Sequence, residues 1–303
     1  MTITLKTHFL YLVKETEVRS FMAILTIARK YGSGGREIGR AISEQLNYAY
    51  VDRKKILDDM RATGKQWEER AKYFDENYPT LWERYDWSFR GFVALNQSYF
   101  LNSALKDKTV IMGRGGNFLL KGIPYVLRTR IIAPMEKRIE KVMEKEGVNS
   151  ENARWMIEKA DHEMSGAIYL IYGRNWDNPA EYDRVFDTSV QPFDEIISSI
   201  KNALIEKEKY NTEKARKILQ LRALAAKVKV EITTNPRFCI SVLDVDPKEE
   251  GLIERGLILR GIIHNQEDIK QIEDIAKKAA GDVPIECELQ YRWFPRFGPS
   301  QFK

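Results

Sequence analysis

The sequence predicts an α/β protein in which helices cover both faces of a mostly parallel sheet, followed by a small α+β domain. Two observations predict this organisation. Short apolar runs alternate with helical patterns from residue 22 to about residue 205. Beyond a charged stretch at residues 206–216, the chain shows two apolar runs of strand type, one helical pattern and a final strand pattern.

These changes of pattern divide the 303 residues into five segments. We expect an N-terminal extension at 1–21, an α/β domain at 22–205, a linker helix at 206–230, an α+β domain at 231–296 and a short tail at 297–303. The extension has an apolar run too short to span a bilayer and no signal-peptide flanks, so a cytoplasmic protein is expected. One hypothesis is that translation begins at Met22 and that the extension is poorly ordered.

Composition limits the classes of function that the chain can have. Charged residues make up 31% and apolar residues 43% of it, as in ordinary globular proteins. The net charge of +5 suits acidic ligands such as nucleotides, but it is too small and too evenly spread to predict nucleic-acid binding. The two cysteines and three widely separated histidines offer neither a disulfide framework nor a metal-ligand spacing.

The first strand, turn and helix carry the strongest functional signal. An apolar strand is expected at residues 23–28, and one face of the helix at residues 36–46 is apolar. Between them lie Gly32, Gly34 and Gly35, which allow positive φ and a close approach of the backbone to a ligand. Because amide groups that converge at the positive end of a helix bind phosphate, we expect this turn to do so.

The turn departs from the P-loop pattern G-x-x-x-x-G-K-[ST] at three of its four defining positions. With Gly35 as the second glycine, Lys30 replaces the first glycine, Arg36 the lysine and Glu37 the hydroxyl residue. Arg36 keeps the positive charge and can fork onto phosphate oxygens. Glu37 cannot supply the usual hydroxyl ligand of Mg²⁺, so the metal ligand is unknown, with Glu37 through water and Asp52 as candidates.

Residues 28–38 resemble the opening motif of the cytidylate-kinase-like family, a branch of the P-loop nucleoside monophosphate kinases with arginine at the lysine position. Motifs similar to those of the family follow in order at residues 50–53, 110–116, 132–138, 172–176 and 182–189. The resemblance implies a three-layer P-loop kinase fold and transfer of the γ-phosphoryl group of ATP, with Mg²⁺, to CMP, dCMP or a similar acceptor. It also implies that the ATP phosphates are held by Gly32, Ser33, Gly34, Gly35, Arg36 and Glu37.

The resemblance places the acceptor at the ends of the second and third strands. The strand at residues 47–51 ends at Asp52 and Arg53, and the strand at residues 109–112 ends at a glycine turn that carries Arg114. These three side chains are the expected acceptor ligands. The plainer alternatives are that Asp52 caps the following helix and that Arg114 is solvated.

Two segments lie between those strands. Residues 67–87 mix aromatic and charged side chains, and residues 89–105 have helical spacing. We expect the first to close over the acceptor base; the alternative is that many of its rings belong to the core. We expect the second to be a structural helix.

The next segment resembles the lid of the nucleoside monophosphate kinases, which brings arginines over the transferring phosphoryl group. A strand at residues 125–132 leads into a helix that begins near Pro134 and carries Arg138, and a second helix runs from residue 149 or 150 to residue 159.

The lid departs from the family pattern at one position. Met164 stands where relatives usually have an arginine, and this loss speaks against full kinase activity. Arg174 is predicted to supply a cation instead. The predicted catalytic residues are therefore Arg36, Arg114 and Arg174.

A strand at residues 184–187 and a helix at residues 192–206 complete the α/β domain. Beyond residue 236, the order strand, strand, helix, strand resembles the BON domain, and Gly256 and Gly261 fall on the second strand as in that module. BON modules are associated with membranes, lipids or partner proteins. The resemblance therefore implies docking, dimerisation or membrane attachment.

Two rival functions remain open. In the first, the chain is a catalytically weak nucleotide sensor that acts through its C-terminal domain. In the second, it is a dinucleotide-binding oxidoreductase, because Asp52 follows Gly32 at the distance of a ribose-binding acid. The third glycine of that fingerprint is missing, since Glu37 occupies its position.

Overall fold

The computed structural model describes residues 23–76, 86–113, 115–250 and 253–293. A five-stranded sheet has the order β2-β3-β1-β4-β5, and every neighbouring pair in it is parallel. Its strands are β1 (Ile24–Arg29), β2 (Ala49–Val51), β3 (Thr109–Met112), β4 (Val126–Ile132) and β5 (Arg184–Asp187). The predicted parallel sheet is confirmed, and β3 and β5 have the bounds expected from the sequence.

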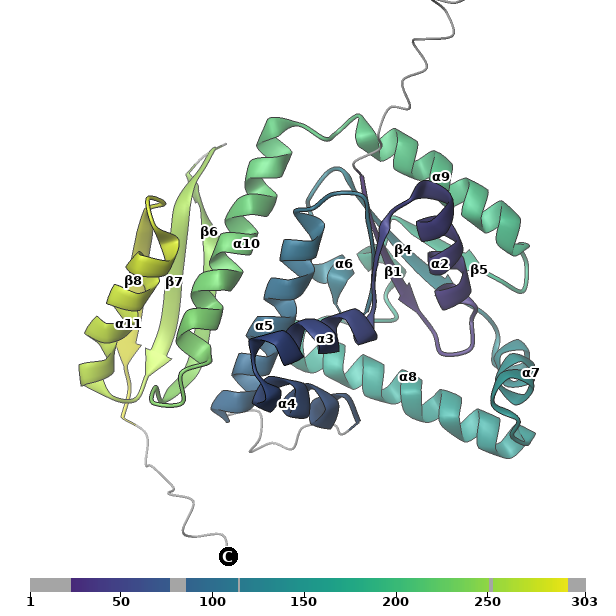
Figure 1. The fold of residues 1–303 in the computed structure, drawn as a ribbon, viewed down its shortest axis with the longest axis horizontal. Coiled ribbons are helices and arrows are strands. Elements are labelled where there is room, and N and C mark those ends of the chain that lie inside the picture. The colour runs from purple at the N-terminus through teal and green to yellow at the C-terminus, as the bar shows by residue number, and fades with distance from the viewer. Residues whose placement is uncertain (1–22, 77–85, 114, 251–252, 294–303) are drawn as a thin grey trace, which may run out of the picture.

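Helices cover both faces of this sheet and make three layers (Figure 1). On one face pack α2 (Gly35–Leu46) and α9 (Phe193–Glu208), and on the other α5 (Trp87–Ala104) and the first half of α10 (Glu213–Thr233). Successive residues of β1 alternate between the two cores, with Ile24 in the α5 core and Leu25 in the α2 core. This is the P-loop kinase fold that the sequence predicts.

Two helices lie between β2 and α5. They are α3 (Arg53–Thr63) and α4 (Lys65–Glu76), of which the sequence analysis did not anticipate α4. Trp67 and Phe74 of α4 are buried in the α5 core, so the core interpretation is right for these two rings. The part of the aromatic region at residues 77–85 lies outside the described residues.

The helices of the lid segment are α7 (Met135–Glu146) and α8 (Ser150–Tyr172). The predicted end of the second helix at residue 159 is wrong. Buried Ala167 and Ile168 keep its second half packed, and it ends where Gly173 takes a φ of 62°. Met164 therefore lies inside a helix rather than on a loop. Short helical turns occur at α6 (Gly116–Leu119) and η2 (Pro179–Glu181).

The C-terminal part forms a second sheet of order β6-β7-β8. β6 (Ile240–Glu250) is antiparallel to β7 (Ile253–Ile263), and β8 (Ile285–Tyr291) pairs with β7 in parallel. α11 (Gln266–Ala280) and the second half of α10 cover it. Gly256 is required by close packing, because a Cβ there would lie 2.5 Å from the carbonyl oxygen of Pro284.

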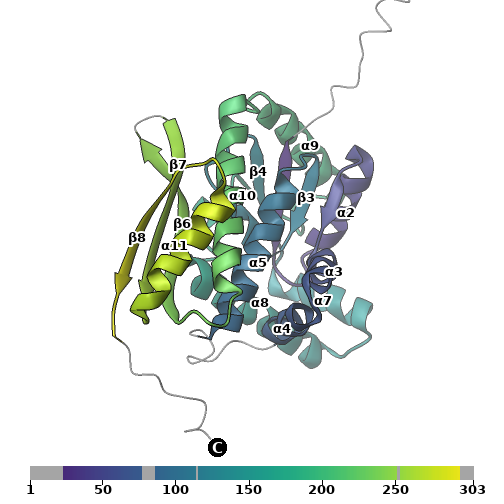
Figure 2. The same ribbon diagram turned by 60° about the vertical axis from the view of Figure 1, so that its left-hand side comes forward.

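α10 belongs to both cores. Leu219 and Ala223 are buried with α5, whereas Val228 and Ile232 are buried against the C-terminal sheet. Figures 1 and 2 show α10 lying between α5 and that sheet. The helix that the sequence predicts as a linker is thus packed along its length.

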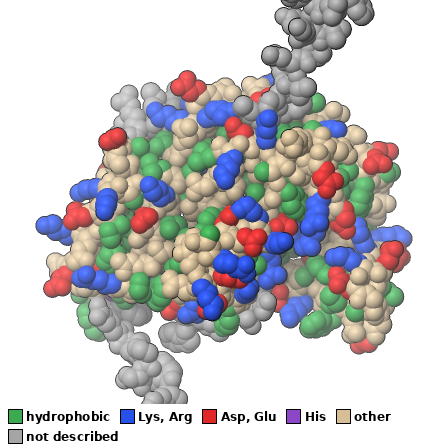
Figure 3. Space-filling model, viewed as in Figure 1, with side chains coloured by type: hydrophobic (Ala, Val, Ile, Leu, Met, Phe, Trp, Pro, Cys, Tyr) green, Lys and Arg blue, Asp and Glu red, His purple; other side chains and the backbone are tan. Residues whose placement is uncertain are grey.

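Charge on the molecular surface is mixed. On the face shown in Figure 3, basic and acidic side chains are interspersed, in keeping with the small net charge of +5. Among the described residues, no helix has the length and apolar character needed to cross a bilayer.

Candidate phosphate-binding site

The turn between β1 and α2 is held in place from two neighbouring elements. The Lys30 N–H and the Ser33 hydroxyl both donate to the Ile131 carbonyl at the end of β4, over 3.1 Å each. From the segment after β5, the Thr188 hydroxyl donates to the Ser33 carbonyl over 2.9 Å. These bonds fix the loop against the carboxyl ends of the strands, where ligands of parallel α/β sheets bind.

Glycine is required at two positions of this loop. Gly34 has a φ of 84°, and a Cβ there would lie 2.3 Å from Cζ of Phe193. A Cβ on Gly35 would lie 2.7 Å from Cβ of Arg29. Gly34 is also the N-cap of α2, and no side chain caps this helix end. The amides of Gly35 and Arg36 in the first turn therefore remain available to an anion, at the positive end of the helix dipole.

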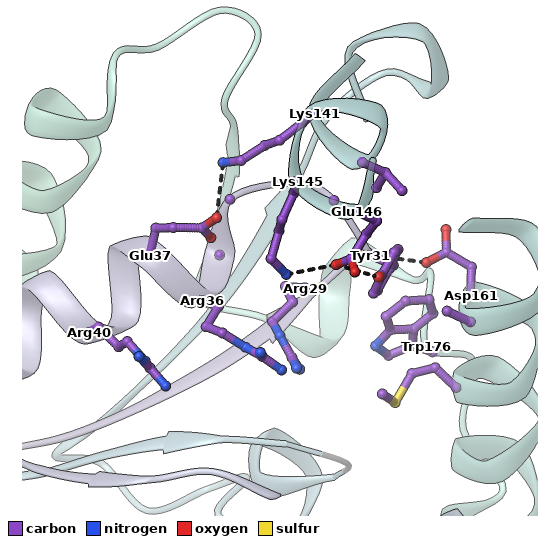
Figure 4. Close-up of a pocket in the computed structure, with 16 residues that line it drawn as sticks. Arg29, Tyr31, Arg36, Glu37, Arg40, Lys141, Lys145, Glu146, Asp161 and Trp176 are labelled. Carbon is purple, nitrogen blue, oxygen red and sulfur yellow. Dashed lines mark hydrogen bonds and ion pairs between the residues drawn. The ribbon is translucent and has the colours of Figure 1, made fainter. Parts of the chain in front are cut away.

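A cavity of about 520 Å³ opens over this helix end (Figure 4). Three arginines line it from β1 and α2, and their side chains extend to the same side in Figure 4: Arg29, Arg36 and Arg40. α7 contributes Lys141 and Lys145. The remaining wall comes mainly from the loop itself, from α8 and from one buried tryptophan: Tyr31, Gly32, Gly34, Gly35, Glu37, Val142, Glu146, Ala160, Asp161, Met164 and Trp176.

Cations outnumber carboxylates around the cavity. The carboxylate of Glu37 lies 3.3 Å from Nζ of Lys141, and that of Glu146 lies 3.2 Å from Nζ of Lys145. Partial burial opposes ionisation of Glu37, but its own backbone N–H and the charge of Lys141 hold its pKa below the ordinary value. The cavity therefore contains an ionised carboxylate and still carries a net positive charge suited to phosphate.

Asp161 connects both lid helices to the loop. Its carboxylate accepts from the Tyr31 backbone N–H over 3.0 Å and from the Arg138 guanidinium over 2.6 Å. Arg138 is 5% exposed and also donates to the Tyr31 carbonyl. This arrangement fixes the distance of α7 and α8 from the phosphate-binding turn.

A second buried cation supports the wall of the cavity. Arg130 of β4 is 3% exposed, with its guanidinium 4.5 Å from the ring centre of Trp176. Its partner Asp177 also lies 3.3 Å from Nζ of Lys30. Burial opposes ionisation of Asp177, but the two cations lower its pKa. The pair positions Trp176 against the cavity.

Comparison with known proteins agrees with this geometry. The family described as cytidylate kinase-like matches residues 24–190, which is more than half of the chain. The chain belongs to the cytidylate kinase-like family. The matched residues include the phosphate-binding turn, both lid helices and β5, and exclude α10 and the C-terminal sheet.

Two cytidylate kinases resemble the family domain over most of their length. That of Methanopyrus kandleri is 28% identical over 201 residues, or 62% of this chain and 98% of that protein. That of Pyrococcus furiosus is 24% identical over 182 residues, or 60% and 88%. A solved shikimate kinase from Acinetobacter baumannii, in complex with shikimate, has 11% identity and a TM-score of 0.38 over 63% of this chain and 97% of that chain.

Five residues of the predicted phosphate cradle line the cavity: Gly32, Gly34, Gly35, Arg36 and Glu37. Ser33 does not line it, because its side chain is buried and its N–H donates to the Lys30 carbonyl over 3.2 Å. Met164, at the expected lid-arginine position, lines the same cavity. Arg174 is outside its lining and lies 3.6 Å from the carboxylate of Glu181. Its predicted part in catalysis stays a prediction.

Asp52 and Arg53, two of the predicted acceptor residues, are not part of this lining. Asp52 is the N-cap of α3 and accepts from the Lys55 N–H over 3.2 Å, which is the capping role considered as its alternative. Arg53 is exposed in the first turn of the same helix. Arg114 lies outside the described residues. Acceptor binding by these three side chains stays a prediction.

Sequence reasoning missed the lysines of α7. Arg138, Lys141 and Lys145 are spaced three and four residues apart, so they share one face of the helix. This spacing is visible in the sequence, but it does not show which face meets the loop. Arg29 and Arg40 were missed because they flank the glycine turn rather than lie within it.

Proposed function

We propose that this chain is a nucleoside monophosphate kinase that transfers the γ-phosphoryl group of ATP to CMP, dCMP or a similar acceptor. The cationic cavity over an uncapped helix end carries the proposal, because it offers amides and guanidinium groups together to a polyphosphate. Membership of the cytidylate kinase-like family supports it.

The residues at the turn fit the donor phosphates. The amides of Gly34, Gly35 and Arg36 would bind phosphate oxygens, which is supported by the position of all three residues in the cavity lining. The Arg36 side chain would hold the transferring group, and Asp52, Arg53 and Arg114 would hold the acceptor. Arg174 would need to leave Glu181 to act as a lid cation.

The donor set also fits Mg²⁺, which favours one or two carboxylates together with phosphate and water oxygens. Among the described residues, no cluster of three or more His, Cys, Asp or Glu side chains could hold a metal, and Glu37 is the ionised carboxylate at the helix end. Glu37, or Asp52 in the alternative, would therefore hold the ion. When bound, Mg²⁺ neutralises charge on the phosphate oxygens.

The test is release of ADP from ATP by the full chain with CMP, dCMP, UMP, AMP and GMP as acceptors. We expect the cytidine nucleotides to react fastest. Arg36→Ala should lower kcat at least about tenfold, equal to about 1.4 kcal/mol of barrier. Arg154→Ala, on an exposed position of α8 outside the cavity, is the matched control and should leave turnover unchanged. If no acceptor supports ADP release, the proposed kinase activity is refuted.

A nucleotide sensor is the second candidate, and Met164 favours it. An apolar side chain at the cavity leaves α8 without the expected lid cation. The sensor would bind ATP with ordinary affinity and release no ADP in the same assay. ADP release with any monophosphate would exclude it.

For the C-terminal part, we propose a BON-like docking or dimerisation role. Support comes from the order of its elements, α10, β6, β7, α11 and β8, and from Trp293, which is 75% exposed at its end. Light scattering and sedimentation with lipid vesicles, both on the full chain, would distinguish a dimer from membrane attachment. If the chain is monomeric and does not sediment with vesicles, docking to a protein partner is what remains of this proposal.

A further inference from the structure

Glu37 and Lys141 form a charged contact across the mouth of the phosphate-binding turn. Glu37 lies on the first turn of α2, Lys141 comes from α7, and the two side chains are 47% and 33% exposed. Both line the cavity. The contact therefore occupies the space where the donor phosphates of the proposed kinase would lie.

We propose that this pair exchanges partners when magnesium nucleotide binds, so that Lys141 contacts the donor phosphates and the Glu37 carboxylate becomes the protein ligand of Mg²⁺. The inference rests on the proposed function, since it concerns the same site. It assigns the metal ligand and adds Lys141 to the residues that bind the donor.

The other acids of the cavity are already engaged. The Glu146 carboxylate lies 3.2 Å from Nζ of Lys145 and accepts from the Tyr31 hydroxyl. Asp161 accepts from Arg138 and from the Tyr31 backbone N–H. Moving Asp161 away would leave Arg138, which is 5% exposed, without its carboxylate. Glu37 and Glu146 both pair with partly exposed lysines, and Glu37 is the one that lies on the first turn of α2, beside the amides of the helix end.

Asp52 is less suited to the metal. It caps α3 through the Lys55 N–H and lies outside the lining of the cavity. A hard carboxylate oxygen beside the phosphates is what Mg²⁺ requires, and Glu37 provides one at the position where P-loops carry their metal-binding hydroxyl.

Lys141 is placed to exchange over a short distance. Its Nζ lies 3.0 Å from the point that a Cβ on Gly34 would occupy and 4.7 Å from the ring centre of Phe193. The ammonium group is thus directly beside the loop. When the carboxylate of Glu37 turns to the metal, a phosphate oxygen is the nearest replacement partner for this charge.

The charges give a distinctive dependence on metal. Without Mg²⁺, a nucleotide must compete with Glu37 for Lys141 and also meets the negative charge of Glu37. With Mg²⁺, both obstacles disappear, because the carboxylate is then a ligand. Removal of the Glu37 charge should therefore abolish the benefit of the metal without weakening binding of free ATP.

Isothermal titration of the full chain with ATP, in excess Mg²⁺ and in EDTA, tests this without any phosphoryl transfer. For the unaltered chain, Mg²⁺ should tighten binding at least about tenfold. In Glu37→Gln the gain should fall below about threefold, with binding in EDTA equal or tighter. In Lys141→Met, ATP should bind about tenfold more weakly under both conditions. Glu146→Gln removes a charge from the same cavity and should keep the full gain.

The outcomes separate this inference from the function on which it rests. If the unaltered chain binds no ATP under either condition, both fail. If ATP binds but Glu37→Gln keeps the full gain from Mg²⁺, the exchange is overturned and the kinase stands. The same holds if Lys141→Met binds ATP as tightly as the unaltered chain. Thermal melts of each variant establish that it is folded.

Discussion

Gly34→Ala is the sharpest test of how the phosphate-binding turn is built. Two separate costs are expected there. Gly34 has a φ of 84°, and an L-residue in the left-handed region loses about 1–2 kcal/mol. The new methyl group would also lie 2.3 Å from Cζ of Phe193, so the ring must move, and such overpacking typically costs about 1–3 kcal/mol.

Gly147→Ala separates these two terms. Gly147 ends α7 with a φ of 67°, and a Cβ there would have nothing within 4 Å. Both substitutions therefore share the backbone cost and the opposing entropic gain of about 0.4–1 kcal/mol in the unfolded chain. The difference between them measures the contacts of the new methyl group, of which that with Phe193 is the shortest and that with the flexible end of Lys141 the next. We expect Gly34→Ala to be less stable than Gly147→Ala by about 1–3 kcal/mol.

The assay is urea unfolding followed by circular dichroism, for both variants and for each in a Phe193→Ala background. In that background the Gly34→Ala and Gly147→Ala proteins should lose nearly the same free energy of unfolding, because the obstructing ring is gone. ATP binding should weaken at least about tenfold in Gly34→Ala alone, equal to about 1.4 kcal/mol. Equal stability of the two single variants would refute this account of the loop.

Three further substitutions test the surroundings of the site. Asp161→Asn leaves the buried Arg138 without its carboxylate and should cost about 2–3 kcal/mol in urea unfolding, whereas a loss near zero would contradict the proposed anchoring of the lid. Burial opposes ionisation of Asp183, but hydrogen bonds from Arg128 outweigh it and hold the pKa of this carboxyl below its ordinary value of 3.8. The ionised carboxylate therefore stabilises the fold fully above pH 3.8, and this stabilisation is lost as the pH falls through the folded pKa. The difference in unfolding free energy between Asp183→Asn and the unaltered chain should therefore be constant above about pH 5 and shrink below about pH 4, and a constant difference down to pH 3 would exclude this assignment. Leu219→Ala, at a fully buried position of α10, should cost about 2–5 kcal/mol, and its unfolding should be a single transition if α10 joins the two cores.

Local patterns were enough to predict the glycine turn between β1 and α2. β1, the glycines and the apolar face of α2 are contiguous in sequence, and their conformations follow from short-range rules. β3 was predicted with its observed bounds because it is a short apolar run that ends at a glycine. β5 was also predicted with its observed bounds, although only its two central residues are apolar.

Longer-range features were harder to predict. Trp67, Ala71 and Phe74 have the spacing of a buried helix face, but the charges between them obscured α4. α8 continues through Asp161 and Met164 because its later residues are buried against the rest of the domain, which no local stop signal reveals. In both cases tertiary packing decided the outcome.

Met164 at the expected lid-arginine position stays a prediction, and its consequence depends on where the other cations of the cavity lie. Electrostatic stabilisation depends on the distance of a charge from the phosphate and not on the helix that carries it. α8 contributes Met164 to the cavity, whereas α7 contributes Lys141 and Lys145 beside the positive end of α2. Cations in that position would hold the donor nucleotide in the ground state as firmly as in the transition state, which lowers KM without raising kcat. Affinity for ATP and turnover, measured separately, therefore distinguish a kinase from a sensor in this chain better than either alone.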